Sequence, residues 1–487
     1  MKKDPSLKAQ ASAIFIGNLI GTVFQFLIPA IIVRLISQED FGIFRQFTLV
    51  AGTFEGLLGF GVASSLYFFY PIADQVGKQR IIQQTQWLIS FNLLVFILVF
   101  YFFGDEILIH LNFSEFINVK KLIVFYLIFI MLSSIVNNIF TLEKNTLLNK
   151  IYPPFEKMGR FLIFLITILV VPGFKGPILA LVFFAAARFI YISTHISPYY
   201  KRIYSIDWNL LKRQVLYSLP FGLALILNLG STTFDKFFIN QYISPAEFGI
   251  YSISFLSIPI LKQFFASIHN VVVPQISISM SNGNLKEAIL LWQKTVDKTS
   301  SITIPAVILF WILAKEIITI LYTEEYVEAA NYYRVFILMF FVSMFSHEII
   351  LRGANKTRFI LYSNLIGTTI TIIAGLIMIP KFGLYGAIST ALLGTVLPMI
   401  VSLHWERKIM KLSIKQWVNW KRIFSNTLIC LLIGVPLLFV KDYVSNIYIR
   451  TFLVIFIFGF SIVVFQIKYN LFIFEQYIPV IRKYLKI

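Results

Sequence analysis

Cysteine is almost absent from this sequence, and its scarcity excludes several kinds of site. Cys430 is the only one, so neither a disulfide framework nor a cysteine-based metal site can form within the chain. It lies in a leucine-rich segment, where we expect an inert interior side chain. The five histidines are scattered, and no two have the spacing of metal ligands on one helix. We therefore expect no bound metal.

Charged residues are also scarce, at 13% of the chain. Hydrophobic residues make up 58%, and the mean hydropathy is +0.80. A water-soluble protein of this composition would expose a continuous apolar surface and aggregate. A helix crosses a bilayer with about 20 consecutive apolar residues, and runs of this length follow one another from Ala11 to Lys468. The composition therefore predicts an all-α polytopic membrane protein.

The apolar runs divide into fourteen candidate spans, at 11–36, 46–70, 81–103, 119–141, 157–172, 177–197, 215–242, 248–272, 300–322, 332–351, 359–379, 384–404, 423–440 and 450–468. The fifth is the weakest, because Pro153 and Pro154 precede it and Pro172 ends it. The amino-terminal run is too long for a signal-peptide core and has no small-residue cleavage pattern, so no cleavable signal peptide is expected.

The positions of the basic residues predict the orientation. With a cytoplasmic amino terminus, Lys and Arg concentrate in the loops assigned to the cytoplasm, for example Lys201 and Arg202, whereas the external loops 104–118 and 323–331 carry acids. The positive-inside rule then places both termini in the cytoplasm. The net charge of +19 reflects topology and attraction to anionic lipid, and no nucleic-acid partner is expected.

An internal repeat divides the chain. Ile36–Phe44 matches Ile243–Tyr251 at an offset of 207 residues, with five identities and two conservative pairs in nine positions. Pro172-Gly173-Phe174-Lys175-Gly176 resembles Pro380-Lys381-Phe382-Gly383 at an offset of 208. A repeat with this period indicates a duplicated structural unit.

The repeat predicts two homologous six-helix lobes, 1–205 and 206–412, followed by two additional helices and a cytoplasmic tail in 413–487. Six is an even number, so the first helices of both lobes cross the membrane in the same direction. The lobes are therefore parallel repeats about an axis along the membrane normal. Transporters built from repeats bind their substrate between the halves, near the midplane.

The repeated motif resembles the polysaccharide-transporter branch of the multidrug/oligosaccharidyl-lipid/polysaccharide (MOP) superfamily. Asp235-Lys236 with the following Ser244–Tyr251, and the segment from Leu351-Arg352-Gly353 to Ile379–Ala387, resemble the same branch. The motifs occur in order along nearly the whole chain. The resemblance implies two six-helix lobes in a V that open alternately to the two sides of the membrane.

The resemblance also implies a function, which is flipping of polyprenyl-pyrophosphate-linked oligosaccharide repeat units across the bacterial cytoplasmic (inner) membrane for O-antigen, capsule or exopolysaccharide. Its expected partners are the lipid-linked oligosaccharide, membrane lipids, and a polymerase and other glycan-assembly proteins. We expect no cofactor, and coupling to protons or sodium ions is open.

Two other functions remain open from the sequence. A cation-coupled drug or small-molecule exporter of the same superfamily would favour an acidic, aromatic cavity over a cationic one. An integral-membrane glycan polymerase or glycosyltransferase would need a large catalytic loop, and no loop is long enough for a nucleotide-sugar domain. We therefore expect a transporter and not an enzyme.

Ionisable side chains at the centre of a span cost at least about 2.5 kcal/mol each, so they are the candidates for functional residues. Three cations are expected to line a lumen for an anionic headgroup, and three acids to serve in coupling or gating; they are Arg188, Lys236 and Lys262, and Glu55, Asp235 and Glu348. Arg34, Arg45 and Arg352 lie near span ends, where long side chains reach the interface.

Each candidate also has a structural interpretation. Glu55 and Lys262 are 207 residues apart, so they occupy equivalent positions in the repeats and form either a gate or a static ion pair. Arg188 contacts either a pyrophosphate, through bidentate hydrogen bonds, or an acid such as Glu55 or Glu348.

The remaining candidates occur in two pairs of sequence neighbours, Asp235 with Lys236 and His347 with Glu348. Asp235 is the best candidate for proton or sodium coupling, and a paired structural role is the alternative. Its neighbour Lys236 projects about 100° away on a helix, so no face-to-face pair of the two is expected. His347 and Glu348 form either a protonation pair or a packing contact.

The predicted orientation can be tested by cysteine labelling. With both termini cytoplasmic, Ser205→Cys should not react with a membrane-impermeant maleimide in intact cells, whereas Glu325→Cys in the external loop should react. Labelling of position 205 in intact cells would reverse the orientation.

Overall fold

The computed structural model describes residues 21–468 apart from 23, 25, 26, 144, 145, 201, 203, 204, 257 and 357. The beginning of the first predicted span, Lys201 and the segment after Lys468 lie outside the described residues. The described residues are helical with no strand, which confirms the all-α class. The chain forms two compact units, unit 1 (Met1–Ser252) and unit 2 (Ile253–Ile487). The lobe boundaries predicted from the repeat stay a prediction, because compactness and duplication need not divide a chain at the same residue.

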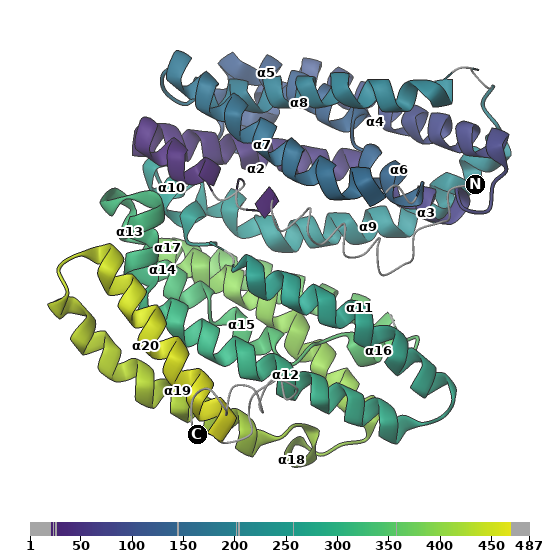
Figure 1. The fold of residues 1–487 in the computed structure, drawn as a ribbon. Coiled ribbons are helices and arrows are strands. Elements are labelled where there is room, and N and C mark those ends of the chain that lie inside the picture. The colour runs from purple at the N-terminus through teal and green to yellow at the C-terminus, as the bar shows by residue number, and fades with distance from the viewer. Residues whose placement is uncertain are drawn as a thin grey trace. The chain divides into compact units, whose positions relative to one another are not determined.

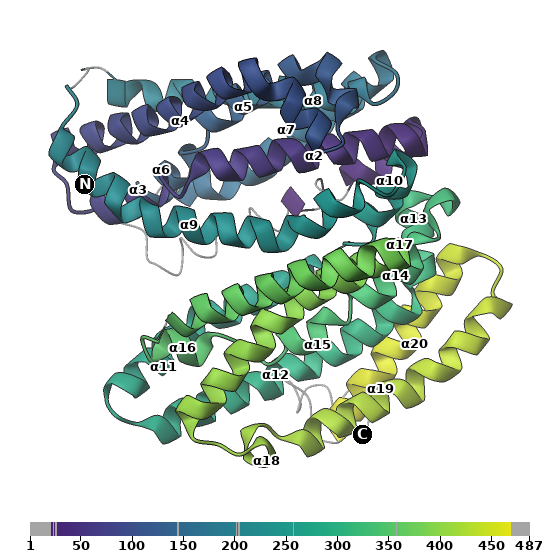
Figure 2. The same cartoon turned by 180° about the vertical axis from the view of Figure 1, so that it is seen from behind.

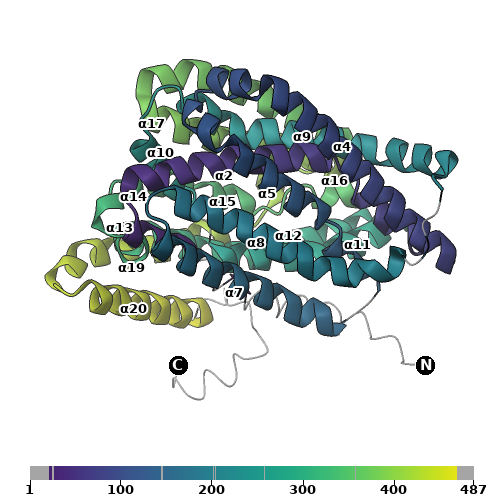
Figure 3. The ribbon, with the colours of Figure 1, turned by 90° about the horizontal axis from the view of Figure 1, so that it is seen from above.

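Unit 1 is drawn in purple to teal in Figure 1. Its helices are α2 (Gln38–Gly59), α3 (Ser64–Phe69), α4 (Gln75–His110), η1 (Ser114–Val119), α5 (Lys120–Leu132), α6 (Val136–Leu142), α7 (Thr146–Val170), α8 (Lys175–Ile196), η2 (Ser197–Tyr200) and α9 (Trp208–Ile239), with α10 (Pro245–Ile253) at its end. Helix α8 packs between α5 and α7, and the pair α7 and α8 is also seen side by side from above (Figure 3). Helix α9 packs along α2 and α3.

Unit 2 contains α11 (Pro259–Ser281), α12 (Leu285–Ile312), α13 (Ala314–Tyr322), η3 (Glu324–Tyr326), α14 (Ala329–Phe336), α15 (Met339–Ser343), α16 (Ile349–Gly353), α17 (Arg358–Met410), α18 (Ile414–Trp417), α19 (Trp420–Val440), η4 (Lys441–Tyr443) and α20 (Ile447–Lys468). Its interior is an apolar cluster around Trp292, Ile304 and Phe458. The rings of Trp292 and Trp417 stack with centroids 5.7 Å apart.

The two copies of the repeated motif begin their helices by the same local chemistry. Ser37 caps α2 by accepting a hydrogen bond from the Asp40 backbone N–H (3.1 Å). Ser244 caps α10 in the same way through Glu247 N–H (3.3 Å), and the Glu247 carboxylate accepts a hydrogen bond from Ser244 N–H (2.8 Å). A Ser followed three residues later by an acid satisfies backbone groups that a helix start leaves without partners. The motif is therefore a helix start repeated in sequence.

Several predicted spans are broken helices. The span 119–141 corresponds to α5 and α6, and 332–351 corresponds to α14, α15 and α16. Helices α12 and α13 meet at an angle of 68°. By length and composition, seven of the described helices are suited to crossing a membrane, or eight if this bent pair is one span. The predicted number of fourteen is therefore not confirmed.

The break predicted between the spans 359–379 and 384–404 is present. Gly383 has φ +52° and ψ −127°, which interrupts α17. An ideal Cβ on Gly367, before the break, would lie 2.4 Å from Pro398, after it. The two parts of α17 therefore lie against each other as a hairpin (Figure 2). Glycine adopts a positive φ without the steric cost that a side chain brings.

The weak fifth span is longer than predicted. Helix α7 begins at Thr146 and includes both Pro153 and Pro154. The expectation that these prolines precede the helix was wrong in this respect, because proline is tolerated inside a transmembrane helix where neighbouring groups satisfy the freed backbone carbonyls. Glu156 therefore lies inside the helix.

The additional helices α19 and α20 lie side by side (Figure 1) and are joined to the rest of unit 2 by a buried ion pair. Lys441 Nζ lies 2.7 Å from Glu316 Oε1, and it also donates a hydrogen bond to the Ile312 carbonyl (3.1 Å). The Glu316 side chain is 1% exposed, and Arg450 Nη1 lies 3.6 Å from the same oxygen. Removing one partner of such a pair leaves an uncompensated buried charge. These contacts fix the α19–α20 connection to the end of α12.

Candidate functional site

The two copies of the repeated motif contact each other. An ideal Cβ on Gly42 would lie 1.7 Å from the Pro245 carbonyl oxygen, and one on Gly249 would lie 3.4 Å from the Gln38 carbonyl oxygen. These two contacts are equivalent under the offset of 207 residues. Reciprocal contacts of this kind mark an approximate twofold relation. Helices α2 and α10 therefore meet across a local twofold axis.

Residues on such an axis contact their own equivalents. Gly249 lies against the Gly42 Cα, 3.4 Å from its ideal Cβ, and Arg45 Nε donates a hydrogen bond to Ser252 Oγ (3.0 Å). Both pairs are separated by 207 residues. Gly42 contacts Gly249, and three residues later in each copy Arg45 contacts Ser252. The two helices therefore run in the same direction, and the local twofold axis is roughly parallel to them. This is the local geometry of a parallel repeat, and an inverted repeat would reverse one register.

Asp235 lies next to this contact. Its side chain is 2% exposed, and Tyr251 OH donates a hydrogen bond to its Oδ2. Tyr251 belongs to α10 and directly precedes Ser252, so Asp235 joins α9 to the helix that forms the axis contact. The acid is therefore placed where its charge affects the position of α10.

Lys236 corrects one expectation. Its Nζ lies 3.5 Å from Asp235 Oδ2, although neighbouring helical side chains project in different directions. The long lysine side chain folds back along α9 and donates its shorter hydrogen bond to the Thr232 carbonyl (2.7 Å). The two neighbours therefore do approach each other.

Arg188 lies in a charged cluster inside unit 1. Its Nε lies 3.3 Å from Glu156 Oε1, and the two side chains are 13% and 18% exposed. Glu55 accepts a hydrogen bond from Tyr126 OH (3.1 Å). Within unit 1, the ion-pair partner of Arg188 is therefore Glu156 from α7 and not Glu55. Sequence reasoning missed Glu156 because the fifth span was expected to begin after it.

Arg160 is a second cation in this cluster, and it was also missed. It lies on α7 one turn after Glu156, and its guanidinium lies over the rings of Phe164 and Phe184 at 5.6 and 5.5 Å. Glu55 is within electrostatic reach of both arginines. In the described part of the chain the Arg160 Nε is buried without a hydrogen-bond partner, whereas the Arg188 Nε is held by its ion pair with Glu156. The sequence did offer one signal for this cluster: Arg160 follows Glu156 by four residues, which places both side chains on the same face of a helix.

The remaining candidates, Lys262 and Glu348, lie in unit 2. Lys262 is exposed in the first turn of α11. Glu348 pairs with Arg352, with Oε2 and Nη2 2.6 Å apart. A gate between Glu55 and Lys262 stays a prediction, as does the lumen role of Arg188, Lys236 and Lys262.

The segment around Glu348 is unwound. Ser346 and Glu348 have φ of +49° and +68°, a region that is unfavourable for residues with a side chain. Glu406, which is fully buried, accepts hydrogen bonds from the Ile350 and Leu351 N–H groups at 2.7 and 3.3 Å. Discontinuous helices recur at transporter sites, and Glu406 satisfies the backbone that this break exposes.

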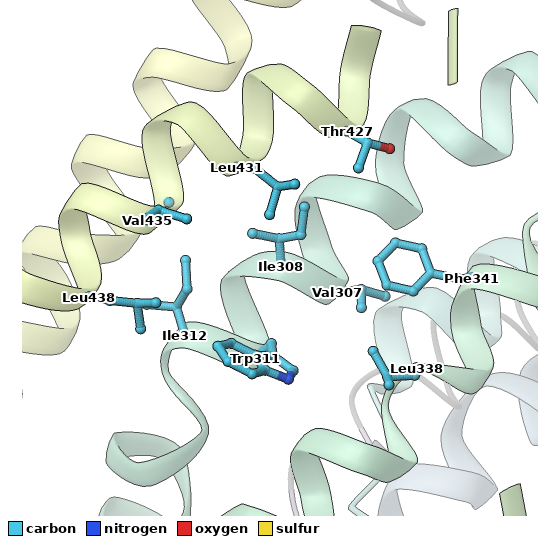
Figure 4. Close-up of a pocket in the computed structure, with 11 residues that line it drawn as sticks. Val307, Ile308, Trp311, Ile312, Leu338, Phe341, Thr427, Leu431, Val435 and Leu438 are labelled. Carbon is cyan, nitrogen blue, oxygen red and sulfur yellow. The ribbon is translucent and has the colours of Figure 1, made fainter. Parts of the chain in front are cut away.

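An apolar pocket of about 290 Å³ lies elsewhere in unit 2, between α12, α15 and α19 (Figure 4). Its lining is Val307, Ile308, Trp311, Ile312, Leu338, Phe341, Thr427, Leu431, Gly434, Val435 and Leu438. Thr427 is the only hydroxyl-bearing residue among them, so the pocket suits hydrocarbon and not a polar group.

Comparisons with known proteins give a consistent result. A family model described as polysaccharide biosynthesis protein matches residues 31–331. An uncharacterized membrane protein of Methanocaldococcus jannaschii, MJ1068, is 26% identical over 202 residues, which cover 40% of this chain and 38% of that protein. The match thus spans less than half of the length of this relative.

Solved structures show the fold. The lipid II flippase MurJ in an inward closed conformation matches with a TM-score of 0.71 at 16% identity, covering 96% of this chain and 99% of that chain. An inward-facing multidrug resistance MATE family transporter of the MOP superfamily matches with a TM-score of 0.59 at 12% identity, covering 82% and 98%. A MOP superfamily transporter from Pyrococcus furiosus matches with a TM-score of 0.54 at 14% identity, covering 83% and 95%. The family model together with this shared fold confirms the predicted resemblance.

The axis contact predicts different effects of two glycine substitutions in α2. Gly42→Ala would place a methyl group against the Pro245 carbonyl, and such overpacking typically costs about 1–3 kcal/mol. An ideal Cβ on Gly52 meets nothing within 4 Å, so Gly52→Ala is the matched control. In thermal unfolding of the detergent-purified protein, Gly42→Ala should lower the Tm and Gly52→Ala should not. Equal Tm values would show that α2 and α10 do not pack as described.

Proposed function

This chain belongs to the polysaccharide biosynthesis protein family, and from that membership we propose that it is an alternating-access flippase for polyprenyl-pyrophosphate-linked oligosaccharide repeat units in a bacterial cytoplasmic membrane. The fold it shares with the lipid II flippase MurJ supports a lipid-linked substrate. The product would be O-antigen, capsule or exopolysaccharide.

The observation that carries this proposal is the arginine pair inside unit 1. A pyrophosphate must leave water to cross the membrane, and fixed cations offset that desolvation. Guanidinium groups bind phosphate oxygens through two hydrogen bonds at once. The Arg160 Nε is buried without a hydrogen-bond partner in the described residues, and the Arg188 Nε forms an ion pair with Glu156. In this proposal the two arginines hold the diphosphate, and Glu156 positions Arg188 until the substrate arrives.

The apolar pocket of unit 2 supports a lipid substrate as well. A polyprenyl chain presents only hydrocarbon, and the pocket between α12 and α19 is lined almost entirely by hydrocarbon side chains. In this proposal, the pocket binds the hydrocarbon of a lipid.

The axis contact is the proposed external gate. The predicted orientation puts Gly42 and Gly249 near the external surface, where α2 and α10 must separate to release the glycan. Asp235 links α9 to Tyr251 of α10. A proton or sodium ion that binds Asp235 would weaken this link, and we assign ion coupling to this residue.

The comparisons do not favour the two other functions, since the fold match to a multidrug resistance MATE transporter has a lower TM-score than the match to MurJ. The family description names polysaccharide biosynthesis and not drug export, and the structural relatives named as transporters and a flippase are not polymerases or glycosyltransferases. The proposal is therefore for a transporter whose partners are the lipid-linked glycan, membrane lipids and glycan-assembly proteins.

The gate can be tested by reversible cross-linking. In an Arg45→Cys, Ser252→Cys variant, a short thiol-reactive cross-linker that can be cleaved by reduction should join α2 to α10, because the native side chains meet at 3.0 Å. Translocation of lipid-linked oligosaccharide in proteoliposomes should stop on cross-linking and return on reduction. Each single cysteine variant, treated identically, is the control. Unchanged translocation by the cross-linked protein would exclude this contact as the gate.

The role of Arg188 can be separated from its ion pair with Glu156. Arg188→Ala should reduce glycan export about tenfold or more, because a hydrogen bond to a charged group contributes about 1.5–3 kcal/mol. The double variant Arg188→Ala, Glu156→Ala removes both charges, so its Tm should recover, but export should stay low. The measurements are surface-polymer level and membrane-protein abundance in a complemented deletion strain. Restored export in the double variant would make the arginine purely structural.

A further inference from the structure

A polar cavity of about 720 Å³ lies at one end of unit 1, apart from the arginine pair. Residues from the end of α3, the start of α4, the end of α6 and the end of α8 line it. Its volume falls in the range of about 300–1,000 Å³ that is usual for small-molecule sites. The charge distribution predicts this end of the helices to be cytoplasmic, which is the side on which lipid-linked glycans are presented to the flippase proposed above.

The side chains in this cavity form a connected polar surface. Tyr70 OH and Tyr199 OH lie 3.2 Å apart, and Tyr199 OH donates a hydrogen bond to Glu143 Oε1. Lys78 Nζ lies over the Tyr70 ring, 5.2 Å from its centroid. Gln75 is exposed at the start of α4. The cavity therefore offers the half-buried ring of Tyr199 together with an amide, an ammonium group and a carboxylate.

This set of groups fits a sugar better than other ligands. Each sugar hydroxyl both donates and accepts hydrogen bonds, and the cavity provides donors in Lys78, acceptors in Glu143 and both in Gln75. The ring of Tyr199, which is half-buried, supplies flat apolar surface for the C–H face of a pyranose, whereas Tyr70 is buried and supports Tyr199 through the contact between their hydroxyl groups. The carboxylate of Glu143 opposes a phosphate ligand, and the polar lining opposes a hydrocarbon chain.

The distance from the arginine pair agrees with a glycan attached to a diphosphate. His195, which also lines the cavity, follows Arg188 by seven residues on α8. At 1.5 Å per residue, the two lie about 10 Å apart along the helix. A headgroup held at Arg188 can therefore direct its first sugars along α8 toward this cavity.

We propose that this cavity is a glycan-binding site that takes one or two hexose units of the lipid-linked substrate before translocation. The identity of the ligand rests on the proposed function, whereas the site itself rests on the cavity and its lining.

Cysteine protection tests the site directly. In Gln75→Cys the new thiol lies in the cavity, and the native Cys430 is buried. Lys212→Cys, an exposed position of α9 in the same unit, is the matched control. The rate of maleimide labelling in proteoliposomes is measured without ligand and in the presence of each of three ligands. These are lipid-linked oligosaccharide extracted from source membranes, the glycan released from that extract by mild acid, and undecaprenyl diphosphate without sugar.

The intact and the released glycan should slow labelling of Gln75→Cys about fivefold or more, and undecaprenyl diphosphate should not. Lys212→Cys should label equally in all cases. Protection by undecaprenyl diphosphate alone would identify a site for phosphate or lipid and overturn the proposal, and so would the absence of protection by either glycan-bearing probe.

A transport assay distinguishes failure of the site from failure of the function. Gln75→Ala, Lys78→Ala should raise the apparent KM for lipid-linked oligosaccharide about tenfold, with kcat and Tm nearly unchanged, because the site binds but does not move the substrate. If the wild-type protein does not translocate this lipid, the proposed function is wrong. If the wild type translocates it and the double variant keeps a normal KM, the cavity is not a glycan site.

Discussion

The hydrocarbon interior of a bilayer cannot solvate a polar group, and this constraint organises the described residues. A charge within a span must find a partner or line a polar space. Arg188 meets Glu156, and Lys441 meets Glu316. Glu406 satisfies the backbone at the break before α16. Because each group depends on a partner from another helix, these few contacts fix the relative positions of helices that hydrophobic packing alone would leave free to slide.

Because the bilayer interior does not solvate polar groups, the polar features of unit 1 lie at separate positions along its helices. From Gly42 to Glu55 along α2, thirteen residues rise about 20 Å, and from Arg188 to His195 along α8 the rise is about 10 Å. The axis contact, the arginine cluster and the polar cavity thus occupy successive levels. The spacing of the charged cluster and the polar cavity is compatible with a substrate whose first sugars adjoin an anionic group, and the axis contact lies beyond both as the proposed gate.

The sequence predicts the fold well and the site only in part. Apolar runs and the duplicated motif predict the helices, the break near Gly383 and the parallel repeat, because these depend on local composition and length. The partners of charged residues depend on packing across helices, which no local pattern determines. Glu156 and Arg160 were therefore missed, since two prolines suggested a later helix start than Thr146. The approach of Lys236 to Asp235 was missed because a flexible side chain does not follow the direction of its Cβ.

The contact between Gly42 and Gly249 constrains how a duplicated gene can change. A residue on the axis contacts the equivalent residue of the other repeat. A substitution there therefore changes the packing against that equivalent residue, and a compensating substitution has to arise in the other repeat of the same chain. Away from the axis, each copy meets different neighbours and drifts independently: Asp40 accepts a hydrogen bond from Phe174 N–H, whereas its counterpart Glu247 caps its own helix. The oldest trace of the duplication should therefore persist at the axis, where the two halves can evolve only together.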